Sequence, residues 1–170
     1  MSNELTPGSD QLISEVNAVF ESVPRPLHFT DHEHCCECAE HDATLSNYEP
    51  GTIPRAALGH GGWDPITFAT DGGFRYYLPA LIRMALTQQG DDYYIDQFLF
   101  QLIRDGAQNS RWRVCSPEQR AMVSRALHLL LEHRLCSIGR WVPGKAHFEN
   151  RAERVQPADT GKCDHHSERV

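Results

Sequence analysis

The chain has 170 residues, a formal charge of −7 from 16 basic and 23 acidic residues, and a hydrophobic fraction of 40%. This composition is typical of one globular domain and excludes wholesale disorder, and an acidic balance without a Lys/Arg cluster argues against a nucleic-acid partner. No stretch reaches the roughly 18 consecutive apolar residues of a membrane span, and residues 1–4 are polar, so we expect a cytoplasmic protein with reduced thiols and no membrane contact.

The first predicted helix spans residues 10–22. Ser9 directly precedes it and is a suitable N-cap, because its hydroxyl can accept a hydrogen bond from the first helical turn. Pro24 and Pro26 end the helix, since proline lacks a backbone donor and pushes the residue before it into an extended conformation. The apolar face follows helical spacing and consists of Leu12, Val16, Val19 and Phe20.

Residues 27–62 are predicted to form a long Cys/His-rich loop between the first two helices. This segment contains five of the ten histidines and three of the six cysteines, is broken by proline and glycine, and has only scattered apolar residues. A loop of this length inside a compact domain is uncommon unless it is functional or cross-linked. We therefore expect a cross-link to order it.

Two more helices follow this segment. The first begins near Thr70, and Pro79 inside its pattern predicts either a kink or a fresh helix start. The second is capped by Asp91 or Asp92 and ends before Gly106. The apolar stripe of the first contains Phe74, Tyr77, Leu78, Leu81, Ile82 and Ala85, and that of the second contains Ile95, Phe98, Leu99, Leu102 and Ile103.

The last predicted helix has a clear start, because Ser116, Pro117 and Gln119 match a capping box with proline in the first turn. Residues 139–142 could form a short strand. Residues 150–170 have almost no large apolar side chain, so we expect a mobile tail. The buried face of the last predicted helix, which begins after Ser116, should contain Val123, Leu127, Leu130, Leu131 and Leu135.

The fold prediction is therefore all-α. We expect a compact bundle of about four to five helices in one domain over residues 1–149, with the Cys/His-rich loop over residues 27–62 between its first two helices.

The candidate site is the stretch His-Glu-His-Cys-Cys-Glu-Cys-Ala-Glu-His at residues 32–41. Cys35 and Cys38 have the Cys-x-x-Cys spacing that brings two sulfurs to one ion, and thiolate and imidazole are ligands of tetrahedral zinc. Glu37 and Glu40 would support the ligands by hydrogen bonds. The other candidate ligands are His34, then His41 and His32, then Cys36 or one of the distant residues Cys115, Cys136, His60, Cys163, His165 and His166.

One Cys-x-x-Cys is only half of a zinc site, so two alternatives stay open. The thiols could be ordinary reduced cysteines among solvated histidines, or they could form a redox pair. Structural zinc is favoured over redox chemistry because the loop has no other visible means of ordering itself. A thioredoxin-type site is not supported, since it requires a βαβ context.

Two separated motifs resemble a bacterial family classed as a domain of unknown function. They are the Cys-x-Glu-Cys element at residues 35–38, followed by Trp63, and the Phe-Arg-Tyr-Tyr-Leu-Pro-Ala-Leu run at residues 74–81. This chain departs from the family at Cys36, which is additional, and at Leu81, where the family often has an aromatic residue. The resemblance extends from residue 12 to about residue 105 and implies that Cys35, Glu37 and Cys38 belong together.

The stretch from Glu33 to Cys38 also resembles alkylhydroperoxidase-D-like proteins, whose Cys-x-x-Cys is followed by a histidine four residues later on a helix. Here His41 lies three residues after Cys38, and the fourth position is Asp42. On a helix this difference moves the imidazole by about 100°. The surrounding sequence is also poor in helix formers. This resemblance implies the alternative function, a thiol-dependent redox enzyme using Cys35 and Cys38.

The leading interpretation is a small cytoplasmic protein with structural zinc that acts by binding a protein partner rather than by catalysis. A protein of the immunity type, whose acidic surface neutralises a basic toxin, is compatible with the charge of −7. The sequence leaves the identity of the partner and the oligomeric state open.

Overall fold

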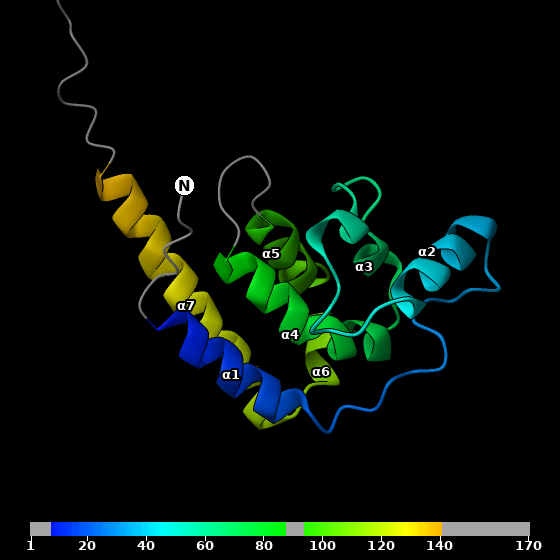
Figure 1. Cartoon of the computed structure of the whole chain (residues 1–170), viewed down its shortest axis with the longest axis horizontal. Helices are drawn as coiled ribbons and strands as arrows, with labels where there is room; N and C mark the ends of the chain where they lie inside the picture. Colours follow the sequence, from blue (N-terminus) through cyan, green and yellow to red (C-terminus); the bar gives the residue numbers. More distant parts are fainter. Residues whose placement is uncertain (1–7, 88–93, 141–170) are drawn as a thin grey trace, which may run out of the picture.

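The computed structural model describes residues 8–87 and 94–140, with side chains up to residue 132. Within these residues it contains seven α-helices and no strand, apart from one isolated antiparallel bridge between Thr30 and Ala69. The predicted all-α fold is therefore confirmed, whereas the predicted tail at 150–170 lies outside the described residues. The elements are α1 (Ser9–Phe20), α2 (Cys36–Ser46), the 3₁₀ helix η1 (Arg55–Leu58), α3 (Pro65–Phe68), α4 (Asp71–Thr87), α5 (Ile95–Ile103), the 3₁₀ helix η3 (Gly106–Gln108), α6 (Ser110–Arg113) and α7 (Pro117–Arg140) (Figure 1).

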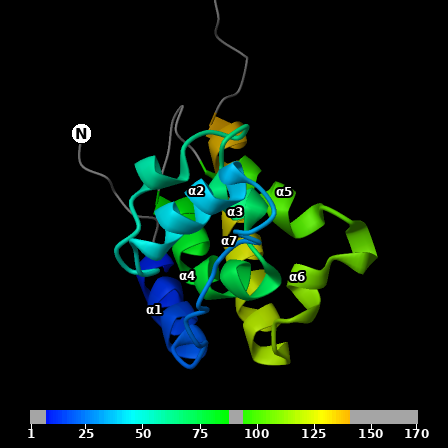
Figure 2. The same cartoon turned by 90° about the vertical axis from the view of Figure 1, so that its right-hand side faces the viewer.

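Helix α4 is the centre of the molecule and contacts α1, α5, α6 and α7 (Figures 1 and 2). Pro79 lies inside this helix rather than at a start, so the alternative of a fresh helix at Pro79 is wrong. The predicted apolar stripe is buried, because each of its members is at most 1% exposed: Phe74, Tyr77, Leu78, Leu81, Ile82 and Ala85. The burial of α4 extends beyond this stripe, for example to Tyr76 and Met84.

Helix α1 packs against α4 and α7 with the predicted residues Leu12, Val16 and Phe20. Its start differs from the prediction. Gly8 is the N-cap with a φ of 95°, a conformation that favours glycine, and Ser9 is the first helical residue, with a buried hydroxyl. The predicted Ser9 cap is wrong because the left-handed turn at Gly8 moves the start of the helix back by one residue.

Helix α7 begins with the predicted capping box. The Ser116 hydroxyl oxygen accepts the backbone N–H of Gln119 at 3.2 Å, and the Gln119 side-chain oxygen accepts the backbone N–H of Ser116 at 3.0 Å. The same Gln119 oxygen accepts a hydrogen bond from Arg75 of α4 at 2.9 Å. This cap therefore also ties the start of α7 to the central helix.

Replacing Ser116 with alanine should lower the free energy of unfolding by about 1 kcal/mol, because an N–H in the first turn of α7 loses its acceptor. Urea unfolding measures this loss. Ser124→Ala is the matched control, since Ser124 lies in the interior of the same helix, where alanine is favourable. Equal stabilities for the two variants would contradict the capping role.

The rest of α7 corrects two predictions. Val123 and Leu130 are buried as expected, but Leu131 is 58% exposed because it lies one residue, about 100°, around the helix from Leu130. Leu135 lies outside the described side chains. The helix continues to Arg140, so the predicted strand is wrong for residues 139 and 140, and residues 141 and 142 are outside the described part. Neither α7 nor any other described helix has an apolar stretch long enough to cross a bilayer.

The predicted loop over residues 27–62 is the largest error. Helix α2 and the 3₁₀ helix η1 form within it. The Tyr77 hydroxyl of α4 donates to the carbonyls of Leu45 and Tyr48, and Arg83 of α4 donates to two further carbonyls just before η1. Leu45 and Leu58 are fully buried. Contacts within the protein therefore hold this segment against α4, and the expected cross-link stays a prediction.

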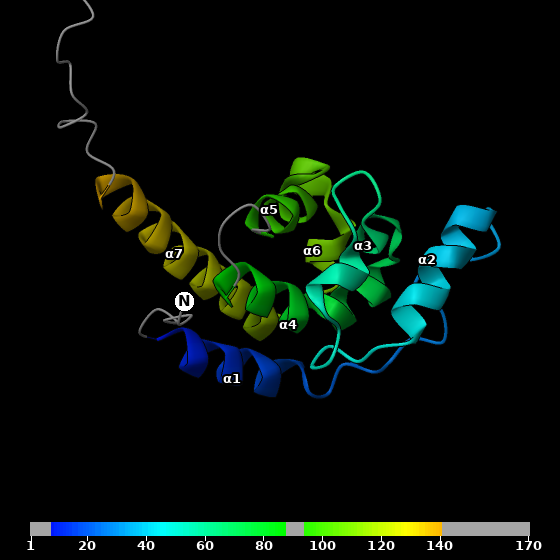
Figure 3. The same cartoon turned by 45° about the horizontal axis from the view of Figure 1, so that its top comes forward.

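Helix α2 lies at the end of the molecule opposite α7 (Figures 1 and 3). It contacts α3, which follows it after η1. Residues 28–34 lead into α2 along a path that is pinned to the start of α4, where the backbone N–H of Thr70 donates to the Phe29 carbonyl at 2.7 Å. This arrangement places the Cys/His stretch on a well-anchored helix that projects from the bundle.

Candidate metal centre

Three donor side chains gather at the N-terminus of α2. A turn closed by the His34 N–H and the Asp31 carbonyl, 3.0 Å apart, precedes Cys35. Cys35 has an extended backbone (φ −162°, ψ 169°) and is the N-cap of α2, and its sulfur accepts the backbone N–H of Cys38 at 3.5 Å. The Cys-x-x-Cys spacing thus coincides with an N-cap and the third residue of a helix, two positions whose side chains lie side by side.

The donor atoms have the spacing of a metal site. The sulfurs of Cys35 and Cys38 are 3.5 Å apart, and Nδ1 of His34 is 3.8 Å from the Cys38 sulfur. All three atoms lie within 4.8 Å of one another. Two sulfurs on one tetrahedral zinc, each about 2.3 Å from the metal, would be about 3.8 Å apart. The group of His34, Cys35 and Cys38 could therefore hold a metal ion.

The three side chains shift one another's pKa. The backbone N–H of Cys38, followed by the His34 side chain, lowers the pKa of the Cys35 thiol. The hydrogen bond to Cys35, followed by burial, raises the pKa of Cys38, and the hydrogen bond to Cys35 raises the pKa of His34. Cys35 is thus the first of the two thiols to lose its proton, and the thiolate is the form that binds metals.

The other two predicted histidine ligands lie outside this group. His32 stacks on His28, with 3.6 Å between the ring centroids. His41 is 1% exposed, and its ring packs against Phe68 at 4.3 Å and Trp63 at 4.8 Å. Its Nε2 has no hydrogen-bond partner in the described part of the chain. The structure brings neither histidine to the donor atoms of Cys35 and Cys38.

The two predicted supporting carboxylates do not touch the donor atoms either. One carboxylate oxygen of Glu37 lies 3.8 Å from Nε2 of His41. The group of Glu37 that faces the Cys35 sulfur is its backbone N–H. Glu40 is exposed, and its carbonyl accepts the hydroxyl of Thr44. Within the described residues, backbone hydrogen bonds hold the three donor residues, and the carboxylates of Glu37 and Glu40 do not.

The more distant ligand candidates are also separate from the group where the structure describes them. Cys36 is exposed, and Cys115 is buried, donates to the Arg111 carbonyl at 3.4 Å and has a pKa raised by burial. His60 accepts the backbone N–H of Gly62. Four candidates lie outside the described side chains: Cys136, Cys163, His165 and His166.

Asp42 and Thr30, which no sequence motif marks, hold the start of α2 in place. One oxygen of Asp42 accepts the backbone N–H groups of Phe29 at 2.6 Å and Thr30 at 3.0 Å, and the other lies 3.0 Å from Nδ1 of His28. The Thr30 hydroxyl donates to the Cys38 carbonyl at 2.7 Å. The sequence contained one signal for the role of Asp42. If residues 36–46 are helical, Asp42 shares a face with Cys38 and Leu45.

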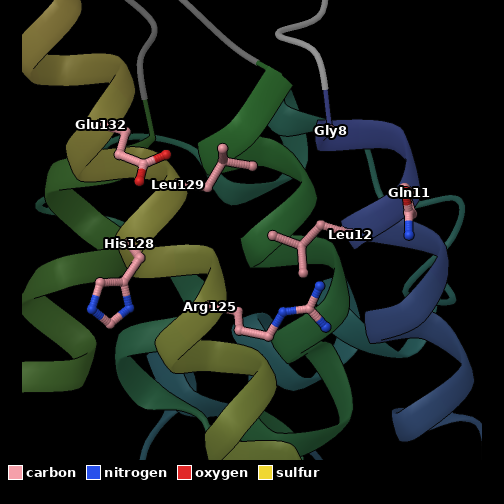
Figure 4. A pocket seen from close by; sticks show the side chains of 7 residues that line it. All are labelled: Gly8, Gln11, Leu12, Arg125, His128, Leu129 and Glu132. Atoms are coloured by element: carbon pink, nitrogen blue, oxygen red, sulfur yellow. The ribbon is translucent and has the colours of Figure 1, made fainter.

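A pocket of about 370 Å³ lies between α1 and α7 (Figure 4). These helices lie at the end of the molecule opposite α2 (Figure 1). Three of its polar side chains, those of Gln11, Arg125 and His128, already have partners in the protein. Arg125 pairs with Glu15, which also accepts a hydrogen bond from Gln11, and Nδ1 of His128 lies 2.8 Å from the Ser124 carbonyl. The His34, Cys35 and Cys38 group is therefore the better candidate for a functional site.

Comparisons with known proteins add no relative, because no family model, curated protein or solved structure matched the chain.

Proposed function

We propose that the protein binds zinc through His34, Cys35 and Cys38 and acts by binding a protein partner. One observation carries the metal part of this proposal, namely that two thiols and an imidazole lie within 4.8 Å of one another at a helix start. Sulfur and imidazole donors favour zinc over calcium or magnesium, which prefer oxygen ligands. Bound zinc would link the turn at residues 31–34 to the first turn of α2 and leave one coordination position for a further ligand.

Charge supports a basic protein as the partner. Between Arg25 and Arg55 the chain has six acidic residues and no lysine or arginine. This segment carries α2 at one end of the molecule (Figure 3), and Asp31, Glu33 and Glu40 are exposed on it. Complementary charge steers association and selects partners. A neutralising protein with a basic target, as in toxin–immunity pairs, fits this acidic end.

Metal analysis of the purified chain, free of affinity tag and chelator, tests the zinc proposal. We expect one zinc ion per chain, with the thiols of Cys35 and Cys38 protected from alkylation until a chelator is added. His34→Ala should weaken zinc binding by more than the roughly 10–100-fold that loss of a ligand's hydrogen-bond partner costs. His34 is exposed, so this variant should still fold.

His32→Ala is the matched control, because this histidine is two residues away and stacks on His28 instead of joining the donor group. It should bind zinc as the unmodified chain does. Absence of zinc from the unmodified chain, or equal losses in His32→Ala and His34→Ala, would show that these three residues do not form the site.

A thiol-dependent redox enzyme is the second candidate, and one observation favours it. The Cys-x-x-Cys lies at the start of a helix, although the sequence around it is poor in helix formers. A helix N-terminus favours a thiolate, and Cys35 is partly exposed there. Peroxide consumption in the presence of a thiol reductant would test this candidate. Turnover well beyond the number of thiols, abolished by Cys35→Ser, would support it, and consumption limited to the thiols would exclude it.

A further inference from the structure

We propose that Cys35 and Cys38 are also an oxidation site, at which a peroxide forms an intramolecular disulfide and the chain thereby releases its metal. This inference rests on the proposed zinc binding and adds a way to reverse it. The oxidation is stoichiometric, one disulfide per chain, and needs no catalytic turnover.

The geometry of the two thiols favours bond formation between them. Their sulfurs are 3.5 Å apart, and a disulfide requires about 2.05 Å, so the sulfurs need to approach by about 1.5 Å. Cys35 is the N-cap of α2 and Cys38 lies in its first turn, and their sulfurs already face one another. No other described cysteine sulfur is in hydrogen-bond contact with either of them, since Cys36 is exposed and Cys115 is buried elsewhere.

Exposure assigns different roles to the two thiols. Cys35 is partly exposed at the N-cap, whereas Cys38 is 8% exposed beneath it. A peroxide in solution therefore reaches the Cys35 sulfur first. The Cys38 sulfur is protected from solvent but lies next to the oxidised Cys35 sulfur. It is therefore placed to act as the resolving thiol, the thiol that reacts with the oxidised cysteine to form a disulfide.

The chemistry balances with hydrogen peroxide as the oxidant. The Cys35 thiolate attacks one peroxide oxygen, the O–O bond breaks, and the products are a sulfenic acid and hydroxide. The Cys38 thiolate then attacks the Cys35 sulfur, the S–O bond breaks, and a second hydroxide leaves as the disulfide forms. The two cysteines together lose two electrons, one peroxide gains them, and protons from solvent convert both hydroxides to water.

Oxidation removes two of the three donors at once, because a disulfide sulfur is no longer a thiolate ligand. His34 alone remains. Helix α2 is also held by hydrogen bonds that involve no thiol: Asp42 accepts the Thr30 N–H, Thr30 donates to the Cys38 carbonyl and Tyr77 donates to the Leu45 carbonyl. Release should therefore leave the helical content unchanged.

Peroxide treatment of the full chain loaded with zinc alone tests the inference. A chromophoric zinc indicator follows release. Mass spectrometry of the peptides detects a disulfide as a loss of two hydrogens, and alkylation of the remaining free thiol shows whether Cys36 lies outside it, as a Cys35–Cys38 disulfide requires. We expect release of all bound zinc together with this disulfide, unchanged far-ultraviolet circular dichroism, and rebinding of zinc after reduction. Cys36→Ser should behave in the same way, because that thiol lies outside the pair.

The possible failures are distinguishable. A chain that holds no zinc before peroxide is added overturns the metal-binding proposal and this inference with it. A chain that holds zinc and keeps it under peroxide, or that releases zinc with disulfides through Cys36 instead of the Cys35–Cys38 pair, overturns only the inference. Release accompanied by loss of helical signal would also overturn it, because unfolding would then explain the release.

Discussion

Replacing Gly73 with alanine should destabilise the protein by about 3 kcal/mol, at the upper end of the usual cost of overpacking. Gly73 is buried in the first turn of α4. A Cβ at this position would lie 2.5 Å from the Phe29 carbonyl oxygen and 3.2 Å from two further backbone atoms of Phe29. Backbone atoms cannot rotate away as a side chain can, so α4 and residues 28–30 would have to separate. Urea unfolding at equilibrium measures the loss.

Gly72→Ala is the matched control for this prediction. Gly72 precedes Gly73 on the same helix but is exposed, and the nearest atom to a Cβ there is the Thr70 hydroxyl oxygen at 4.0 Å. Alanine should be neutral there or stabilise the helix by up to about 1 kcal/mol. Equal effects at the two positions would show that the contact between α4 and Phe29 is not tight.

The second large effect is expected at Asp42, which is 7% exposed. Asp42→Ala removes the acceptor of two backbone N–H groups, those of Phe29 and Thr30, and leaves both unsatisfied in a buried place. Each such loss costs about 1–3 kcal/mol, so the two together should destabilise the protein by about 2–6 kcal/mol. The proposed zinc affinity should fall as well. Asp42 holds Thr30 in place, and the Thr30 hydroxyl donates to the carbonyl of Cys38, one of the three donor residues.

The pH dependence of stability distinguishes the stability contributed by the charge of Asp42 from the stability contributed by its side-chain shape. Burial raises the pKa of Asp42, but the hydrogen bonds from His28, Thr30 and Phe29 outweigh burial and hold it below the ordinary value. A carboxyl with a lowered folded-state pKa contributes stability above its unfolded pKa of about 3.9 and loses that contribution as the pH falls through the folded value.

Asp42→Asn keeps the shape and removes the charge. The stability difference between the unmodified chain and this variant should therefore be largest near neutral pH and shrink below about pH 4, where the carboxyl becomes protonated. Urea unfolding across this pH range measures the difference. A difference that stays constant with pH would show that the ionised form of Asp42 is not what stabilises residues 28–30.

Several features of the fold were predictable because they depend on local physics. The stripe from Phe74 to Ala85 has the period of a helix, and all its members are buried in α4. The Ser116 and Gln119 capping box needs only three residues of separation, and the structure forms it. The Cys-x-x-Cys spacing likewise brings Cys35 and Cys38 together within one helical turn.

Helix α2 was not predictable in the same way. Its sequence, Cys-Glu-Cys-Ala-Glu-His-Asp-Ala-Thr-Leu-Ser, contains several residues of low helix propensity and no broad apolar face. The helix is stabilised from outside itself, by the Tyr77 hydroxyl on the carbonyl of Leu45 and by the contacts of Asp42 with Phe29 and Thr30. Propensity summed along the chain does not contain these partners, which lie at least 12 residues away.

Local sequence was enough to predict the helical class, the central stripe of α4, the cap of α7 and the pair of thiols, because each of these depends on residues no more than a few turns apart. Long-range packing, in contrast, selects the histidine that lies beside the thiols. On a helix His41 turns inward against Phe68 and Trp63, and His32 is drawn to His28, so both are taken up by packing. His34 remains beside Cys35 because the turn at residues 31–34 precedes the helix and leaves its ring exposed at the N-cap.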